Sequence, residues 1–313
     1  MRAVWLKEFG GPGVLVAGEA PDPVPGPGQV LIEVAFANVT FVETQFRATG
    51  SGPFAADLPM VPGNGVGGVI SRAGAEVDPA LVGHRVVTAT GGRGGYAQRV
   101  VVDAARVFPV PDALSLDAAV ALLADGRTAT GLVHATAVAP GDRVLVEAAA
   151  GGVGSLLVQL AKAAGAEVVA AAGGPEKLAR ARDLGADLAV DYTDPVWPEE
   201  AGEVDVVFDG VGGRVGTAAF SLLRPGGRMA IYGLSSGSWT DVSEEDAQAR
   251  GVRLVRSIGD PAALRGFTEA ALEAAAAGQL IPVIGQRFPL ERAADAHAAM
   301  ESRGTIGKTL LIA

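Results

Sequence analysis

The feature that most restricts the fold is a regular alternation of short apolar runs and helical patterns from about residue 115 onward. Strands that helices cover on both faces are apolar throughout, and this alternation is typical of βαβ units. The pattern therefore predicts a parallel sheet. We expect its strands at residues 144–149, 167–172, 204–209, 228–233 and 252–258, and helices at 153–164, 176–184 and 214–223.

The chain before about residue 112 has a different pattern, because Gly and Pro interrupt it every few residues. Short β-rich runs between the interruptions are typical of an antiparallel sheet or barrel. We expect strands at residues 30–37, 66–71, 85–89 and 96–102. From about Ile281 the chain returns to short strands around one last helix, and we expect this tail to complete the first domain.

Composition excludes several classes of protein. The net charge is −10 and no basic tract occurs, which argues against nucleic-acid and anionic-membrane partners. No cysteine is present, so disulfides, thiolate zinc sites and cysteine nucleophiles are excluded. The chain lacks a signal-peptide pattern and any apolar run near the roughly 20 residues of a membrane span. We therefore expect a soluble, cytoplasmic protein.

One glycine motif matches the dinucleotide fingerprint letter for letter but has the wrong context. Residues 63–68 read G-x-G-x-x-G, yet a proline-rich segment precedes them and a strand pattern follows. The motif has its mechanical meaning only between a strand and a helix. We interpret this segment as a turn into a strand.

A second glycine segment has the required context. Ala150, Gly151, Gly152, Val153 and Gly154 follow a strand pattern and open a helical one. A glycine at 151 would admit a pyrophosphate, a glycine at 154 would let the helix pack close to the strand, and the phosphates would lie at the helix N-terminus. These residues are our candidate cofactor site; the alternative is a glycine-rich turn that binds nothing.

The end of the next predicted strand indicates which dinucleotide binds. NAD enzymes normally place an acidic residue there to accept the ribose 2′-hydroxyl. This chain has Gly173 and Gly174 instead, which leaves room for a 2′-phosphate, and Lys177 follows in the first turn of the next helix. We predict NADP(H), with Lys177 pairing with the 2′-phosphate; the alternative is an ordinary solvated lysine.

The whole chain resembles the zinc-independent, zeta-crystallin-like quinone oxidoreductases of the medium-chain dehydrogenase/reductase superfamily. Segments along its full length carry the resemblance through their order and spacing. They are V-E-T at 42–44, P-G at 62–63, G-G-Y-A at 94–97, P-G-D-R-V-L-V at 140–146, A-x-x-G-x-x-G at 148–154, V-V-F-D-G-V-G-G at 206–213, L-R-P-G-G-R at 223–228 and R-G-T-I-G-K at 303–308.

The resemblance implies an α/β protein in which a GroES-like β-rich barrel domain accompanies a Rossmann domain with a doubly wound parallel sheet. We expect a GroES-like catalytic domain at 1–114, a Rossmann NADP-binding domain at 115–260, and a C-terminal segment, 261–313, that returns to the catalytic domain. Relatives are usually NADP(H)-dependent homodimers. Their cofactor contacts fall on Gly152, Val153, Gly173, Lys177, Tyr192, Gly233 and Lys308, and Thr128 matches a position near the cofactor.

The metal chemistry of the wider superfamily does not fit this sequence. Zinc alcohol dehydrogenases use Cys ligands, whereas this chain has no Cys and three dispersed His, so we expect no metal site. Without a Lewis acid, reduction of a conjugated acceptor is favoured over alcohol oxidation. Thr40, Gln45 and Thr128 are the candidate hydrogen-bond donors of the substrate pocket, and Thr40 and Gln45 stand where many relatives carry Asn and Tyr.

The predicted function is an NADPH-dependent reductase that transfers hydride to a quinone without zinc. One alternative is an alkenal or enoyl-thioester double-bond reductase that uses NADPH. Another, of a different class, is an NADPH-binding structural or sensor protein with little turnover. The expected partner is a small-molecule quinone or conjugated carbonyl.

Overall fold

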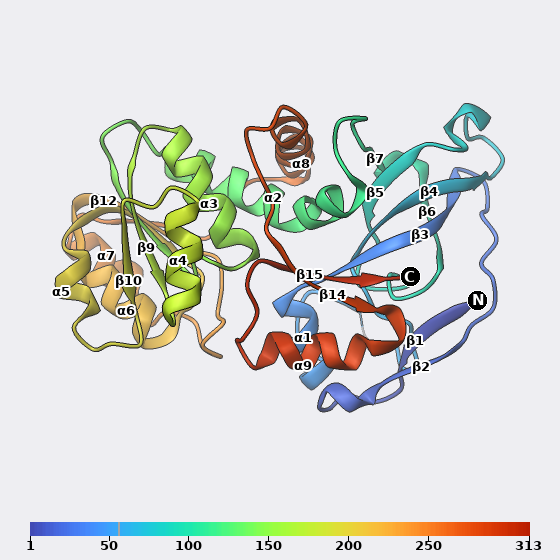
Figure 1. The fold of residues 1–313 in the computed structure, drawn as a ribbon, viewed down its shortest axis with the longest axis horizontal. Helices are drawn as coiled ribbons and strands as arrows, with labels where there is room; N and C mark the ends of the chain where they lie inside the picture. The colour runs from blue at the N-terminus through green and yellow to red at the C-terminus, as the bar shows by residue number, and fades with distance from the viewer. Residues whose placement is uncertain (56) are drawn as a thin grey trace. The chain divides into compact units, whose positions relative to one another are not determined.

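The computed structural model describes residues 1–55 and 57–313 and divides into two compact units (Figure 1). The split unit comprises Met1–Ala124 and Leu272–Ala313, and the parallel-sheet unit comprises Asp125–Ala271. The domain boundaries predicted from sequence fall near the starts of α2 (Leu116–Thr136) and α8 (Pro261–Ala276). The two compact units divide within these helices, and the predicted domain boundaries stay a prediction.

A seven-stranded sheet dominates the split unit, in the order β14-β15-β3-β4-β5-β7 with β6 also paired to β3. Strand β15, near the C-terminus, pairs antiparallel with β3, so the tail of the chain extends the sheet of the N-terminal segment. The elements of this unit are β1 (Arg2–Leu6), β2 (Leu15–Glu19), β3 (Gln29–Val39), α1 (Phe41–Thr49), β4 (Gly65–Ala73), β5 (Arg85–Ala89), β6 (Arg99–Asp103), β7 (Phe108–Pro109), β14 (Ile284–Pro289), α9 (Ala293–Glu301) and β15 (Lys308–Ile312), with short 3₁₀ turns at Pro12–Val14, Pro79–Leu81, Ala104–Arg106 and Leu290–Arg292.

The glycine motif at residues 63–68 enters a strand, as we predicted. Strand β4 begins at Gly65 and no helix follows the motif. A Cβ on Gly68 would lie 1.9 Å from the carbonyl oxygen of Glu33, and one on Gly67 would lie 2.3 Å from Val120. These glycines therefore allow close packing around β4, and the interpretation as a turn into a strand is confirmed.

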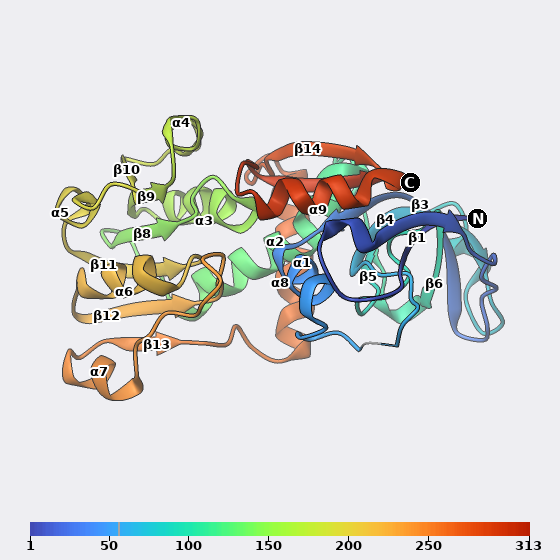
Figure 2. The ribbon, with the colours of Figure 1, turned by 90° about the horizontal axis from the view of Figure 1, so that it is seen from below.

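The parallel-sheet unit holds six parallel strands in the order β10-β9-β8-β11-β12-β13. Figure 2 shows these strands side by side in that order. Chain order reverses between β8 and β11, which is the arrangement of a doubly wound Rossmann sheet. Its elements are β8 (Arg143–Glu147), α3 (Gly152–Ala163), β9 (Glu167–Ala172), α4 (Pro175–Asp183), β10 (Leu188–Asp191), α5 (Trp197–Ala201), β11 (Val204–Asp209), α6 (Gly213–Ser221), β12 (Leu223–Ile231), α7 (Glu244–Ala249) and β13 (Arg253–Val255).

The predicted strands of this sheet agree with the structure except at their ends and at one omitted strand. The predictions at 167–172 and 204–209 match β9 and β11. Strand β12 ends at Ile231, before the predicted end, and the N–H groups of Tyr232 and Gly233 both donate to the carbonyl of Asp209. Strand β10 has four residues and was not predicted from the apolar pattern.

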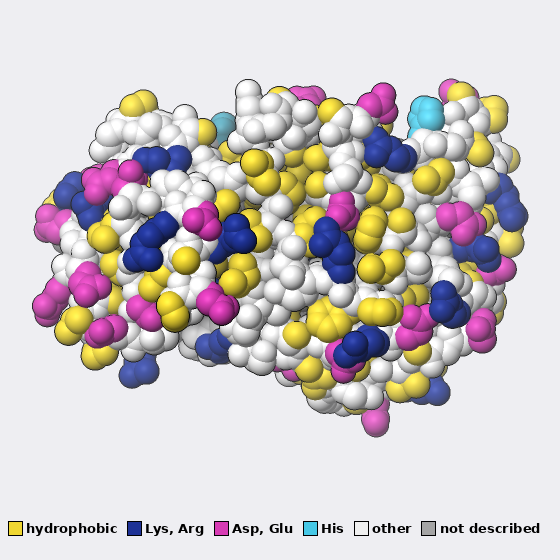
Figure 3. All heavy atoms as spheres, in the orientation of Figure 1, with side chains coloured by type: hydrophobic (Ala, Val, Ile, Leu, Met, Phe, Trp, Pro, Cys, Tyr) yellow, Lys and Arg dark blue, Asp and Glu magenta, His cyan; other side chains and the backbone are white. Residues whose placement is uncertain are grey.

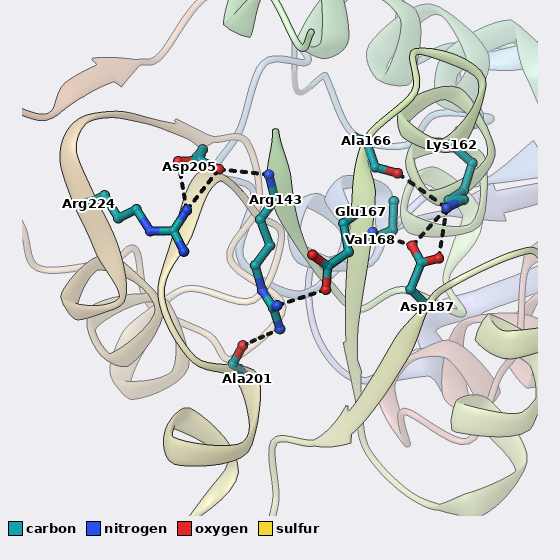
Figure 4. Close-up of polar contacts among 9 residues, drawn as sticks. All are labelled: Arg143, Lys162, Ala166, Glu167, Val168, Asp187, Ala201, Asp205 and Arg224. Atoms are coloured by element: carbon teal, nitrogen blue, oxygen red, sulfur yellow. Dashed lines mark hydrogen bonds and ion pairs between the residues drawn. The ribbon is translucent and has the colours of Figure 1, made fainter. Parts of the chain in front are cut away.

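Ion pairs join the amino-terminal ends of the parallel strands (Figure 4). The Arg143 amide donates to the Asp205 carboxylate at 2.8 Å, and its guanidinium pairs with Glu167 at 2.7 Å. Lys162 pairs with Asp187 at 2.8 Å. These contacts stabilise the amino-terminal edge of the sheet, whereas ligands of doubly wound sheets bind at the opposite, carboxyl-terminal edge.

Charges of both signs are interspersed on the face of the molecule that Figure 3 draws. No helix within residues 1–55 and 57–313 combines the length and apolar character needed to cross a membrane.

Candidate cofactor site

The predicted glycine loop lies at the carboxyl end of β8, the strand at which the sheet order reverses. Ala148 leaves the strand with φ of 47°, and the Gly151 amide donates to the Ala148 carbonyl at 2.7 Å. A Cβ on Gly154 would lie 2.2 Å from that same carbonyl oxygen. Close packing of helix and strand therefore requires glycine at 154, as predicted.

The beginning of α3 is suited to bind an anion. Gly151 is the N-cap residue, and it has no side chain that could accept a hydrogen bond from the first turn of the helix. The N–H groups of the first helical turn, which include those of Gly152 and Val153, have no partner inside a helix. Together with the helix dipole they favour a phosphate group at this position.

The second predicted subsite follows β9. Gly173 and Gly174 connect this strand to α4, and a Cβ on Gly173 would lie 3.2 Å from the ring of Tyr192. Lys177 lies in the first turn of α4. The structure therefore brings the predicted residues Gly173, Gly174 and Tyr192 together beside the helix that carries Lys177.

Asp191 is a carboxylate at this subsite that sequence reasoning missed. Its side chain accepts from the Gly174 amide at 3.1 Å, and from the amide and hydroxyl of Thr193 at 2.9 and 2.7 Å. The hydrogen bond from the Thr193 hydroxyl is the main cause that lowers the pKa of Asp191. Asp191 ends the short strand β10 and holds the Gly174 turn in place.

Gly233 brings a further loop, the one after β12, to the same edge. A Cβ on Gly233 would lie 2.5 Å from the carbonyl oxygen of Gly210. The loops after β8, β9, β10 and β12, which all leave the carboxyl ends of strands, thus carry the predicted cofactor residues of the parallel-sheet unit except Lys177, which lies on α4, and Thr128, which lies on α2. The cofactor role of each residue stays a prediction.

A pair of buried carboxyl groups lies at the ends of β8 and β11, which are neighbouring strands. Glu147 and Asp209 are fully buried and both accept from the Val211 amide, at 3.1 and 3.2 Å. Asp209 also accepts from the Gly212 amide at 2.7 Å and from the Thr240 hydroxyl. Burial, followed by the charge of Asp209, raises the pKa of Glu147 well above its usual range.

The candidate residues in the split unit have a different setting. The Thr40 hydroxyl donates to the Glu43 carboxylate at 2.6 Å, and Glu43 also accepts from the Thr40 and Asn64 amides at 2.7 and 2.8 Å. Glu43 therefore orients local backbone. Gln45 lies on the same helix, α1, whereas Lys308 is buried at the start of β15 and its charge acts on Glu43.

Each of the three histidines has a structural setting. His84 is exposed, and the ring of His134 lies 5.4 Å from that of Phe267. His297 is buried and hydrogen-bonded to Tyr96 at 2.9 Å, and burial lowers its pKa to about 3. Within the part of the chain that the structure describes, no three His, Asp or Glu side chains gather as a metal site requires.

Two protein-family models match the chain, one within the split unit and the other mostly within the parallel-sheet unit. The alcohol dehydrogenase GroES-like domain matches residues 26–112, and the zinc-binding dehydrogenase domain matches residues 152–274. Among curated proteins, human quinone oxidoreductase is 32% identical, with the alignment covering 100% of this chain and 98% of the relative. The chain belongs to the quinone oxidoreductase family of the medium-chain dehydrogenase/reductase superfamily.

Two further relatives add detail to this family assignment. A 2-haloacrylate reductase from a Burkholderia species is 33% identical over 100% of this chain and 99% of its own length. The crystal structure of Escherichia coli quinone oxidoreductase complexed with NADPH superimposes with a TM-score of 0.90 and 28% identity, covering 100% of both chains.

The contact between Gly154 and Ala148 generates a prediction about two neighbouring glycines. Gly154→Ala forces α3 away from β8, so it should lower the melting temperature and weaken NADPH binding at least tenfold. Gly151 has φ of −79°, which any residue can adopt, and its Cβ would lie 3.1 Å from the nearest atom, the Ala148 carbonyl oxygen. Gly151→Ala should therefore keep the fold while weakening NADPH binding.

Differential scanning calorimetry and NADPH fluorescence titration measure the two effects. Gly266→Ala is the control, because this glycine is exposed on α8 and a Cβ there would contact nothing within 4 Å. An unchanged NADPH affinity in Gly154→Ala would contradict the assignment of the loop.

The buried pair generates a prediction about pH. Because the raised pKa of Glu147 keeps a proton that the unfolded chain releases above its usual pKa of 4.5, the unfolding free energy falls as pH rises from that value. The decline attributable to this group is at most about 1.4 kcal/mol per pH unit. Glu147→Gln keeps hydrogen-bonding atoms and cannot ionise, so its stability should decline less between about pH 5 and pH 8. Urea unfolding measures both slopes, and parallel slopes would show that Glu147 ionises normally in the folded protein.

Proposed function

We propose that this protein is an NADPH-dependent reductase that reduces quinones without a metal ion. The observation that carries the proposal is the glycine loop at the reversal point of the parallel sheet, in which Gly154 packs against Ala148 and the N-terminus of α3 has no side-chain cap. Family membership supports the same function, because relatives that align along the whole chain are quinone oxidoreductases.

The residues fit an NADPH molecule. The uncapped N-terminus of α3 would hold the pyrophosphate. Gly173, Gly174 and Tyr192 would hold the adenosine end of the cofactor. Lys177 would pair with the 2′-phosphate. The sequence offers no carboxylate at the end of β9, and Asp191 from β10 directs its oxygens to donors within its own turn. A 2′-phosphate therefore meets a lysine rather than a free acid.

When bound, NADPH supplies a hydride, which is two electrons and one proton. The chain supplies position and hydrogen bonds, since a conjugated acceptor spreads the arriving charge onto its own oxygen. Because the Thr40 hydroxyl donates to Glu43, its remaining lone pairs accept hydrogen bonds, and the Gln45 amide and the Thr128 hydroxyl are each proposed as hydrogen-bond donors. Water supplies the second proton.

A second candidate function is reduction of a conjugated carbon–carbon double bond, with alkenals and enoyl thioesters as further substrates. The 33% identity to a 2-haloacrylate reductase along the whole chain favours it. The same binding groups serve both reactions, because each acceptor delocalises the charge of the incoming hydride. A structural or sensor protein would bind NADPH without turnover.

An acceptor panel tests the proposed function. NADPH absorbance is followed with 1,4-benzoquinone, an enal, an enoyl thioester and the saturated ketone analogue of the enal. We expect consumption with the conjugated acceptors, and much slower consumption with the saturated ketone. Tight NADPH binding with no turnover on any acceptor would indicate the sensor function instead.

The choice of cofactor generates a prediction about Lys177. Lys177→Glu replaces an attraction for the 2′-phosphate by a repulsion, so it should weaken NADPH binding by about 1–3 kcal/mol and leave NADH binding nearly unchanged. Fluorescence titration with both cofactors measures this. Lys7→Glu, at an exposed lysine of the split unit, is the control. Equal affinity of the unmodified protein for NADPH and NADH would refute the assignment.

The side chains that could ligate a metal generate a prediction about zinc content. No cysteine is present, and carboxylates and dispersed histidines do not make the tetrahedral zinc site of this superfamily. Purified protein should contain no stoichiometric zinc, and a chelator should leave quinone reduction unchanged. Activity lost to a chelator and restored by zinc would overturn this prediction.

We further propose that the protein acts as a cytoplasmic homodimer with domains at 1–114, 115–260 and 261–313, as the family resemblance implies. Size-exclusion chromatography with light scattering tests the dimer.

A further inference from the structure

A pocket of about 400 Å³ lies within the parallel-sheet unit, near the ends of β12 and β13. Its lining includes Arg127 and Thr128 of α2, Tyr232 after β12, Arg256 after β13, and apolar side chains such as Trp239 and Ile258. This volume is within the range of small-molecule sites, and a few polar groups in an apolar wall are typical of them. The pocket includes Thr128, a candidate donor, and adjoins Gly233 in the chain.

Arg127 is the unusual member of this lining. Its side chain makes no hydrogen bond and no salt bridge with any residue in 1–55 or 57–313, although it is partly buried. Other partly buried arginines are paired: Arg143 with Glu167 at 2.7 Å, and Arg228 with Asp142 at 2.8 Å. Burial lowers the pKa of Arg127, and the charge of Asp125 opposes that effect.

Arg256 adds a second guanidinium to the lining, but its hydrogen-bonding capacity is partly used. It donates to the Val242 carbonyl at 3.1 Å and faces the exposed Glu244 at 3.5 Å. Arg127 is therefore the cation whose five N–H donors remain for a ligand. A partly desolvated cation without such partners is unfavourable, and a ligand anion would relieve this cost.

We propose that this pocket binds the acceptor and that Arg127 selects conjugated acceptors that carry a carboxylate, namely α,β-unsaturated acids. The planar guanidinium matches a carboxylate with two parallel hydrogen bonds. Pairing also draws negative charge out of the conjugated system, which makes the β-carbon a better hydride acceptor. The proposal rests on the proposed reductase function. One hydride and one proton add across the double bond, whose π bond is replaced by two C–H bonds, while NADPH becomes NADP⁺.

The test compares an acid with its own ester. Initial rates with NADPH give kcat/KM for 2-chloroacrylate and for its methyl ester, with 1,4-benzoquinone as a neutral reference acceptor. Arg127→Met removes the charge at similar length, so the acid-to-ester ratio of kcat/KM should fall about 10- to 100-fold. Arg127→Lys should recover part of the ratio. Arg265→Met is the matched control, because Arg265 lies on α8 outside the pocket lining and pairs with Glu269 at 2.9 Å.

Calorimetric titration of 2-chloroacrylate into the NADP⁺-loaded protein provides a readout that needs no turnover. Binding should weaken by the same factor in Arg127→Met. An unchanged ratio or unchanged binding of the acid overturns the proposal. Equal losses for acid and ester, together with weaker NADPH binding, overturn it by assigning Arg127 to the cofactor. Benzoquinone turnover without turnover of either chloroacrylate also overturns it.

Absence of turnover with all three acceptors would refute the proposed reductase function itself. In that case the calorimetric comparison of the unmodified protein with Arg127→Met still decides whether Arg127 binds the acid.

Discussion

The approach of Gly154 to the carbonyl of Ala148 is the constraint on which the candidate cofactor site depends. With 2.2 Å available to a Cβ, no side chain fits between helix and strand, so α3 begins directly against the end of β8. That strand lies where the sheet reverses its order. The helix N-terminus, with its unsatisfied N–H groups, is thereby held where doubly wound sheets bind their ligands. The glycines after β9 and β12 then complete the same edge.

The two edges of the parallel sheet are stabilised in different ways. At the amino-terminal edge, Arg143 and Lys162 pair with carboxylates that are partly exposed. At the carboxyl-terminal edge, Glu147 and Asp209 are fully buried and converge on one amide, and burial raises the pKa of Glu147. Neither carboxyl group supplies positive charge to this edge, so an anionic ligand there depends on the dipole at a helix N-terminus such as that of α3.

The side-chain groups available in this protein limit the reactions that it can catalyse. Thiolates are missing from the sequence, and each histidine is exposed, packed at a tilt against an aromatic ring or buried against a tyrosine. Hydroxyl, amide and guanidinium groups remain. Such groups stabilise charge that a conjugated acceptor has already spread, and they do little for a localised alkoxide. Arg127 extends this principle, since it neutralises an acceptor that carries its own negative charge.

The sequence by itself determined the strand, loop and helix around Gly151, the glycine subsite at Gly173, and the exclusion of thiolate chemistry. These depend on local spacing and residue type, which a linear pattern records. Only the tertiary structure decided that Asp191 reaches the Gly174 amide, 17 residues away, that Glu147 meets the Val211 amide, 64 residues away, and that Arg127 lines a pocket. Sheet order selects which strand ends become neighbours, and no local pattern encodes that order because it is set by packing between segments distant in the chain.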